Sequence, residues 1–440
     1  MKRRIKRKIR KLFRICLLLI ILLLIIYIII HLICRLFKKS YSSDTVNVVK
    51  TIEEKYLDFD ITTKSEKDIQ NIDYYFMEGM KTSDFKEILR EKNNSIISND
   101  KYKKIKYNFE RVLHYFDIEE ILKELNNSES VKLEIIGKSV DNRNIYGIEI
   151  GSGEDVLFLD ANIHAAEVST TYILIKFLID VVNLYERGNT DVNNLLNNIK
   201  IVAIPCINPD GYEVYNYGID SIRNKDLYIY KNKDKIDFNN IKSNANGVDL
   251  NRNFPTQNSG LLYKGKKLKN NTSIDITTER GKYFNGYSVG SEPEVKSVIY
   301  YMLKYYKNIY AYINLHSQGR VIYYGKPNLS KDFNKVTEKF ASRISSITSY
   351  KLNDSSYEEV GEGNDGSATD FMSELANGFI FSEITGRLST NKYKNNNCKL
   401  VYNYPVITME VTKDWTSNPS YFKSEYNNYV KKALFEILEK

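Results

Sequence analysis

The alternation of apolar and polar positions predicts a folded α/β domain that begins at about residue 111. Short runs that are continuously apolar or alternate with a period of two predict strands, and they cover 131–136, 145–150, 156–160, 201–207, 311–315 and 406–411. Longer runs with helical spacing predict helices at 115–125 and 168–185, after residue 291, and from about 420. Strands that alternate with helices in this way indicate a sheet with helices on its faces.

Local signals refine three connections in this pattern. Asp141 and Asn142 separate the first two strands and predict a turn. The segment 208–211, Asn-Pro-Asp-Gly, also predicts a turn, because proline and glycine stand where a turn needs them. Ser291 with Glu294 three residues later predicts an N-cap and a capping box for the following helix.

The N-terminal region carries a different hydrophobic pattern. Ile15 to Cys34 is an uncharged run of twenty residues, long enough as a helix to cross a hydrocarbon core of ~30 Å. Nine cations precede the run and three follow it, which predicts a cytoplasmic N-terminus and an extracytoplasmic chain beyond it. A cleaved signal peptide is the competing interpretation, but no Ala-x-Ala site follows the run. We therefore expect a basic segment at 1–14, one transmembrane helix at 15–34, and a stalk or small helical spacer at 35–110.

Charge and cysteine content narrow the class of protein. The net charge of +9 comes from the twelve cations of residues 1–39, so the remaining chain, with 52 basic and 55 acidic residues, has a charge of −3. A nucleic-acid-binding function is therefore not indicated. Cys206 and Cys398 are the cysteines outside the apolar run. They could form one bridge or stay unpaired, and they do not make a disulfide framework.

Four side chains stand out as candidate metal ligands or as a candidate base. His164 and Glu167 form a His-x-x-Glu pair at the start of a predicted helix, a spacing that lets both side chains reach one metal ion. His316 ends a predicted strand. Each of these signals is weak alone, since a lone histidine is more often structural. Glu410 lies inside the apolar run 406–411, where an unpaired carboxylate is costly to bury. The alternative is that Glu410 lies on the solvent face of an edge strand.

Five segments in order carry a resemblance to a known family. They are His164–Glu167, Asn208–Tyr212, Asp249–Phe254, the segment around His316, and Thr408–Val411. Together they resemble the zinc carboxypeptidases of the carboxypeptidase A type, over about residue 115 to near the C-terminus. The resemblance implies a mixed, mostly parallel eight-stranded sheet flanked by helices, a catalytic domain at 111–440, and one Zn²⁺ per chain.

The resemblance also implies roles for individual residues. His164, Glu167 and His316 match the zinc ligands, and Glu410 matches the general base. Asn251 and Arg252 match the pair that binds the substrate's terminal carboxylate. The arginine that polarises the scissile carbonyl corresponds to Arg223 by its distance from residues 208–211, while Lys242 is an alternative by its similarity to bacterial relatives. Tyr357 is the candidate for the mobile tyrosine of the pocket. Ala166 replaces an arginine of the family motif, and the stretch 379–404 is longer than in digestive members.

The function that this pattern favours is a membrane-anchored extracytoplasmic zinc metallopeptidase. Its expected substrates are peptidoglycan stem peptides, cut at the γ-D-glutamyl–diamino acid bond, and its partners are this substrate and the lipid bilayer at 15–34. Removal of C-terminal residues from ordinary peptides is the alternative. An inactive anchored binding module would be expected to lack a metal ligand or the base, but all three ligands and Glu410 are present. An acylase acting on N-acyl amino acids has the same ligands, but the motifs at 208–211 and 249–254 favour a peptidase.

Overall fold

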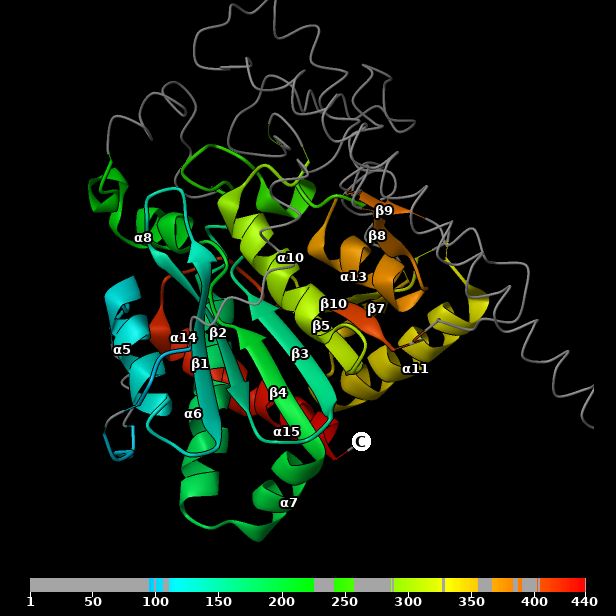
Figure 1. Ribbon diagram of the computed structural model, residues 1–440, viewed down its shortest axis with the longest axis horizontal. Helices are drawn as coiled ribbons and strands as arrows, with labels where there is room; N and C mark the ends of the chain where they lie inside the picture. Colours follow the sequence, from blue (N-terminus) through cyan, green and yellow to red (C-terminus); the bar gives the residue numbers. More distant parts are fainter. Residues whose placement is uncertain are drawn as a thin grey trace, which may run out of the picture. The chain divides into compact units, whose positions relative to one another are not determined.

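The fold is built on a mixed eight-stranded sheet (Figure 1). The computed structural model describes residues 95–98, 100–105, 111–224, 241–256, 286, 289–326, 329–354, 366–382, 387–389, 402 and 404–439. The expected membrane span, and the short helices that the pattern of 35–94 suggests, lie outside these residues. The strands of the sheet are β1 (Val131–Lys138), β2 (Asn144–Ile150), β3 (Asp155–Ala161), β4 (Ile199–Ile204), β5 (Ile309–Ser317), β6 (Val321–Tyr324), β7 (Lys351–Asn353) and β10 (Val406–Val411).

Helices connect and cover these strands, and two short strands form a separate pair. The two strands are β8 (Ile380–Ser382) and β9 (Arg387–Ser389). The helices are α5 (Tyr115–Leu125), α6 (Val168–Glu186), α7 (Thr190–Asn198), α8 (Pro209–Tyr217), α10 (Pro293–Tyr305), α11 (Lys331–Thr348), α13 (Ala368–Ala376), α14 (Pro419–Glu425) and α15 (Lys431–Leu438). Single turns of other helix types are η2 (Ile219–Ser221), η3 (Leu250–Arg252) and η5 (Tyr426–Val430).

The centre of the sheet is parallel and its two sides are mixed. The spatial order is β1-β2-β4-β3-β5-β10-β6-β7, and β4, β3, β5 and β10 run parallel to one another. β1, β2 and β6 pair antiparallel with their neighbours toward the centre. The predicted eight-stranded mixed sheet is therefore confirmed. Because the central strands are parallel, their carboxyl ends lie at one edge, where α/β sheets place their sites.

Two hydrophobic layers hold the helices on opposite faces of the sheet. On β3, Leu157 and Leu159 pack with α6, α14 and α15, while Val156 and Phe158 pack with α10 and α13. The strand is buried on both faces, as expected for a continuous apolar run. Figure 1 shows α10 crossing one face of the strands and α6 with α15 on the other.

The structure corrects two predicted connections. Glu292, not Ser291, is the N-cap of α10, and Pro293 takes the first helical position. No side chain caps this helix; the Ser291 hydroxyl instead donates to the Glu292 carboxylate. At residues 208–211 the expected turn is the first turn of α8, because Asn208 accepts a hydrogen bond from the Gly211 amide and Pro209 is already helical.

Part of the predicted spacer packs against the edge of the domain. Ser95 forms an isolated bridge with Glu134 of β1, and the Ile96 amide donates to Leu133 O. The Tyr102 hydroxyl donates to Asn183 of α6. The described residues from 95 to 105 therefore line the β1 side of the domain.

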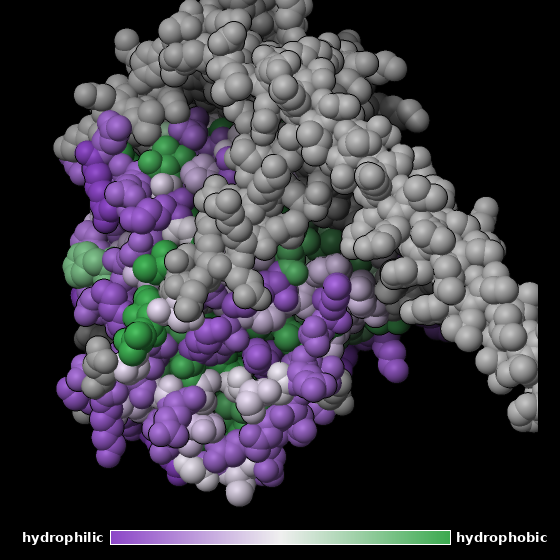
Figure 2. Space-filling model, in the orientation of Figure 1, coloured by the Kyte–Doolittle hydropathy of each residue, from purple (hydrophilic) through white to green (hydrophobic). Residues whose placement is uncertain are grey.

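The surface of the described region is largely polar. Figure 2 shows hydrophilic side chains over most of the coloured face, with apolar ones in small groups between them. Among the described helices, α6 alone has the length and apolar composition to cross a membrane, but 72% of that stretch is buried and it packs as a core helix.

Candidate metal centre

The candidate site lies at the carboxyl edge of the central parallel strands. The chain leaves β3 at Ala161, passes through His164 and Glu167, and enters α6. His316 lies near the end of β5, the neighbour of β3, and Glu410 lies on β10, the next strand. Three consecutive strands of the sheet thus deliver the predicted ligands and the predicted base to one edge.

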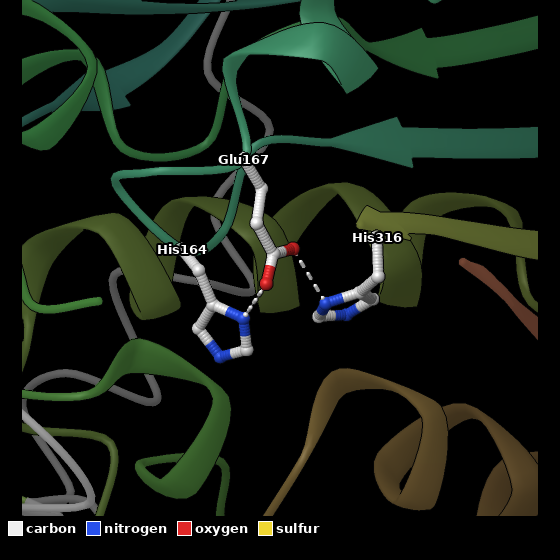
Figure 3. Close-up of side chains that lie close together, drawn as sticks. All are labelled: His164, Glu167 and His316. Atoms are coloured by element: carbon white, nitrogen blue, oxygen red, sulfur yellow. Dashed lines mark hydrogen bonds and ion pairs between the residues drawn. The ribbon is translucent and has the colours of Figure 1, made fainter. Parts of the chain in front are cut away.

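His164, Glu167 and His316 converge on a single point (Figure 3). His164 Nδ1 lies 2.7 Å from Glu167 Oε1, and His316 Nδ1 lies 2.9 Å from Glu167 Oε2. All three side chains are buried, and their candidate ligand atoms lie within 4.8 Å of one another. A compact group of two imidazoles and one carboxylate is therefore held together away from bulk water.

This donor set fits zinc. Zinc takes nitrogen and oxygen ligands at about 2.0–2.2 Å in a tetrahedral arrangement, which places neighbouring donors about 3.4 Å apart. The three donors here already lie within the range that one ion can bridge. Burial would raise the pKa of Glu167, but the two imidazoles outweigh burial and hold its pKa well below the ordinary value. The carboxylate is thus ionised, as a metal ligand must be.

Asp249 contacts the His164 ring on the side away from Glu167. This residue was not singled out from the sequence. Its Oδ1 lies 3.3 Å from His164 Nε2, on the side of the ring away from Glu167, and its side chain is fully buried. Burial raises the pKa of Asp249, but the His164 imidazole, followed by Arg252 and Lys242, lowers it well below the usual range. An ionised carboxylate at this nitrogen orients the ring and presents Nδ1 to a metal. The sequence signal was its position two residues before Asn251 in a motif already recognised.

A cavity of about 190 Å³ opens beside the three donors. Its lining includes Glu410, Lys242, Asn251 and Arg252, four of the residues that the sequence proposed for catalysis and binding. Arg223 is not part of this lining; its guanidinium donates to Asn142 O at an exposed position, 3.0 Å away. Tyr357 and most of the stretch 379–404 lie outside the described residues.

Glu410 reaches the cavity from an interior strand. β10 pairs with β5 on one side and β6 on the other, so the alternative of a glutamate on an edge strand is wrong. Along β10 the side chains of Thr408 and Glu410 are partly exposed and line the cavity, whereas Met409 and Val411 point into the core. The period of two in a strand therefore sets a carboxylate at the cavity wall.

Asn251 and Arg252 are held in η3 by a network that includes the start of α13. Asp249 caps this turn by accepting a hydrogen bond from the Asn251 amide, and the Asn251 side chain accepts one from the Ala368 amide. Gly366 packs closely against this segment: with a φ of +93°, a Cβ there would lie 2.8 Å from Arg252 O. A residue without a side chain is needed at this approach.

Lys242 is positioned by the same loop that carries the metal ligands. The Ala165 amide donates to Lys242 O and the Ala166 amide donates to Ile241 O. Ala165 and Ala166 lie between His164 and Glu167 in the sequence, so this strand-like pairing couples Lys242 to the His-x-x-Glu segment. The Lys242 ammonium lies 5.9 Å from the centre of the Trp415 ring, which also lines the cavity.

A mixed α/β sheet with two buried histidines and a glutamate beside a cation-lined cavity defines a protein with a mononuclear zinc-type centre. The model of the zinc carboxypeptidase family matches residues 118–429. The chain belongs to this family, and the predicted resemblance is confirmed.

The chain is similar in sequence to both bacterial and animal proteins. It is 29% identical over 217 residues to γ-D-glutamyl-L-diamino acid endopeptidase 1 of Lysinibacillus sphaericus, covering 48% of this chain and 51% of that protein. It is 24% identical over 269 residues to carboxypeptidase O of Bos taurus, covering 58% and 64%. The structure of bovine thrombin-activatable fibrinolysis inhibitor in complex with tick carboxypeptidase inhibitor matches with a TM-score of 0.53 and 20% identity, over 75% of this chain and 97% of that one.

The chain spans between about a third and two thirds of the length of the curated relatives it matches. The structural match, at 20% identity, shows that the carboxypeptidase fold is shared.

Proposed function

We propose that the protein is a zinc metallopeptidase that hydrolyses an amide bond next to a terminal carboxylate of its substrate. The observation that carries the proposal is that one cavity brings together the three metal donors, the Glu410 carboxylate and the cations Lys242 and Arg252. Zinc at His164, Glu167 and His316 would supply a Lewis acid and lower the pKa of its water toward ~7. Other residues that line the cavity would supply the general base and the groups that bind the negative charges of the substrate.

Glu410 is the proposed general base. Its partly exposed carboxylate can take a proton from the attacking water and pass it to the departing amine. Arg252 and Asn251 are proposed to hold the terminal carboxylate, because a guanidinium can bind both carboxylate oxygens at once. These two residues share η3, so the carboxylate would be held at a fixed place relative to the metal.

Lys242, rather than Arg223, is proposed to stabilise the oxygen that becomes negative. Lys242 lines the cavity, and its backbone pairs with the segment that carries His164 and Glu167. The Arg223 guanidinium instead bonds to a backbone carbonyl at the surface. We expect Lys242→Met to lower kcat by about 10²- to 10³-fold, as loss of one such donor does, and Arg223→Met to leave kcat nearly unchanged. The opposite ranking would move the role to Arg223.

The proposed substrate is a peptidoglycan stem peptide, cut at the γ-D-glutamyl–diamino acid bond. Support comes from the similarity to an enzyme named for that bond and from the cationic cavity, which suits a substrate with several carboxylates. Removal of C-terminal residues from ordinary peptides is the second candidate. The animal carboxypeptidases among the relatives favour it.

Product masses distinguish the two candidates. The full chain with zinc is incubated with a stem peptide that contains the γ-D-glutamyl linkage and with linear peptides whose C-termini are free or amidated. Release of the diamino-acid portion from the stem peptide alone supports the cell-wall function. Trimming of free but not amidated linear peptides supports a general carboxypeptidase. An inactive binding module would cut none of them and would lack stoichiometric zinc in a metal analysis. If nothing is cut while zinc is bound, the right substrate is missing from the panel.

We propose further that residues 15–34 anchor the chain in a bilayer with the zinc domain outside the cytoplasm. The proposal is supported by the uncharged run of twenty residues and the excess of cations before it. The full chain should remain with membranes after extraction at alkaline pH, and removal of 1–39 should release it. Extraction of the full chain under these conditions would contradict an anchor.

A further inference from the structure

A buried amide side chain lies close to Lys242 in the chain but outside the cavity. Asn244 follows Lys242 by two residues, and its side chain is fully buried. Its Nδ2 donates to Glu292 Oε2 at 2.8 Å and to Glu294 Oε2 at 3.0 Å. Both glutamates are buried and stand at the N-terminal end of α10. Asn244 is not among the residues that line the cavity, so it has no direct contact to offer a substrate there.

The oxygen of the same side chain closes the loop that follows it. Asn244 Oδ1 accepts from the Asn246 amide at 3.0 Å and from the Val248 amide at 3.1 Å. The Asn244 amide in turn donates to Val248 O at 2.9 Å. An asparagine offers an acceptor and two donors on one planar group. This side chain therefore holds its own loop together with its oxygen and fastens the loop to α10 with its nitrogen.

The charges around Asn244 require a neutral donor at this position. Burial, followed by the charges of Asp210 and Glu292, raises the pKa of Glu294 to about 8. Negative charge is therefore already disfavoured at the start of α10, and a carboxylate in place of Asn244 would add to the repulsion. Asn246 Nδ2 also donates to Glu292 Oε2 at 2.8 Å, but Asn246 is partly exposed. The two asparagines thus share a partner and differ in their access to water.

Backbone contacts connect the place of Asn244 to that of Lys242. Ser243 separates the two residues, and its carbonyl oxygen accepts from Asn208 Nδ2 at 3.1 Å. The Lys242 backbone pairs with the His-x-x-Glu segment, and its ammonium reaches the cavity 5.9 Å from the centre of the Trp415 ring. Because consecutive residues are bonded to the rest of the domain, a shift of Asn244 has to be taken up within two residues of this cation.

We propose that Asn244 is a positioning residue: by anchoring its loop to Glu292 and Glu294, it fixes the Lys242 ammonium where the reacting carbonyl lies. This inference rests on the proposed function, in which Lys242 stabilises the oxygen that becomes negative, and extends it to a residue outside the cavity. Loss of the anchor displaces the ammonium, and a misplacement of about 1 Å can lower a rate by about 10²-fold. Because the cation acts in the transition state, kcat should fall while KM stays close to the wild-type value.

A double-mutant cycle tests the assignment with the zinc-loaded full chain and the peptide that the wild type cuts best. Asn244→Asp places a third carboxylate among the buried ones and should lower kcat by about 10²-fold. In the Lys242→Met background the same substitution should cost no more than about twofold, because the cation it displaces is already gone. Asn246→Asp is the matched control: it adds the same charge beside Glu292 at a partly exposed position and should leave kcat close to the wild-type value.

Two kinetic outcomes would overturn the assignment. One is an equal fall in kcat with and without Lys242, which is what a purely structural role would produce. The other is a change confined to KM. Asn244→Ser removes the amide donor without adding a charge, so it repeats the cycle where Asn244→Asp does not fold.

A structural measurement separates this inference from the proposed function. Crystal structures of the wild type and of Asn244→Ser are compared at one distance, from Lys242 Nζ to the centre of the Trp415 ring, which is 5.9 Å here. A change of about 1 Å or more in the variant, the scale that matters for a rate, supports the positioning role even where the wild type cuts no peptide and the proposed function fails. An unchanged distance overturns the positioning role whatever the wild type cuts.

Discussion

Glu410 of β10 and His316 of β5 are register partners on adjacent parallel strands. The pairing places a candidate metal ligand and a candidate base at the same level of the sheet, above the carboxyl edge. Neither group depends on a flexible loop for its position, because both are on strands that are hydrogen-bonded on each side. Rigid strands are the elements that hold a reacting pair in a defined geometry.

This relationship predicts that the base can be removed without loss of the metal. Glu410→Gln keeps the size of the side chain and removes its basicity, and none of the three donors is altered. We expect the rate of peptide hydrolysis to fall by about 10²- to 10⁴-fold, the usual value of a general base. Zinc content, measured by elemental analysis, should stay at one per chain. A variant that keeps more than a tenth of the activity would contradict the role of Glu410.

The metal donors predict a different result. His316→Ala removes one of three ligands, so zinc should be lost on dialysis. For the wild type, zinc at a hundred times its Kd should add about 2.7 kcal/mol to the free energy of unfolding by mass action, and the variant should gain little. Thermal unfolding with and without zinc measures both. His114→Ala is the control: this histidine is half-exposed, stacks on Tyr217 and pairs with Glu213, so zinc binding should persist.

A buried carboxyl in the core predicts a pH dependence of stability. Burial raises the pKa of Asp160 from 3.8 to about 7, although the Tyr312 hydroxyl, which donates to it, acts in the opposite direction. Between these values the unfolded chain loses the proton while the folded protein keeps it. The contribution of Asp160 to stability is therefore complete below about pH 4 and is lost as the pH rises to about 7.

Asp160→Asn isolates this contribution because asparagine does not titrate. The unfolding free energy of the variant relative to wild type should increase between pH 4 and 8 by about 4 kcal/mol, from ~1.4 kcal/mol per pKa unit. Urea unfolding at several pH values, with a chelator present throughout, measures the difference and removes metal loss as a cause. A difference that does not change with pH would show that Asp160 is ionised in the folded protein.

The close approach of Gly366 to Arg252 predicts a destabilising substitution. Gly366→Ala adds a Cβ 2.8 Å from Arg252 O, at a backbone φ of +93°. Gly188→Ala is a matched control with a φ of +72° and no atom within 4 Å of the added Cβ. We expect the control to lose about 1 kcal/mol from backbone strain and Gly366→Ala to lose about 1–3 kcal/mol more from overpacking. Equal losses in chemical denaturation would show that the segment shifts freely.

Local pattern was enough to predict most of the central elements. The predicted strand at 406–411 and helix at 115–125 have the bounds of β10 and α5, and 168–185 is one residue shorter than α6. These segments have a single strong period and are buried by the elements they pack against. The short strands β6 and β7 were not predicted, because runs of three or four residues carry no period that distinguishes them from loops.

Cap chemistry was predicted less well than periodicity. Ser291 has the residue type of an N-cap, but Pro293 favours the first helical position and moves the boundary by one residue. The choice between Arg223 and Lys242 could not be made by counting residues, since loops tolerate changes in length. The backbone pairing of Ala165 and Ala166 with Lys242 and Ile241 is a tertiary contact that no local pattern reports.

The sequence displayed the groups from which the chemistry was predicted: an imidazole–carboxylate pair at helical spacing, a second histidine at a strand end, and a glutamate in an apolar strand. Each signal was weak alone, and the ordered resemblance to the family assigned their expected roles. Side-chain type and period are local properties, so a sequence displays them directly. Convergence is not local. The approach of His316 to Glu167, the support of His164 by Asp249, and the pairing of Lys326 with Asp370 join segments far apart in the chain. Only the packing of the sheet and its helices brings such segments together, because burial of their shared core fixes which strand ends are neighbours.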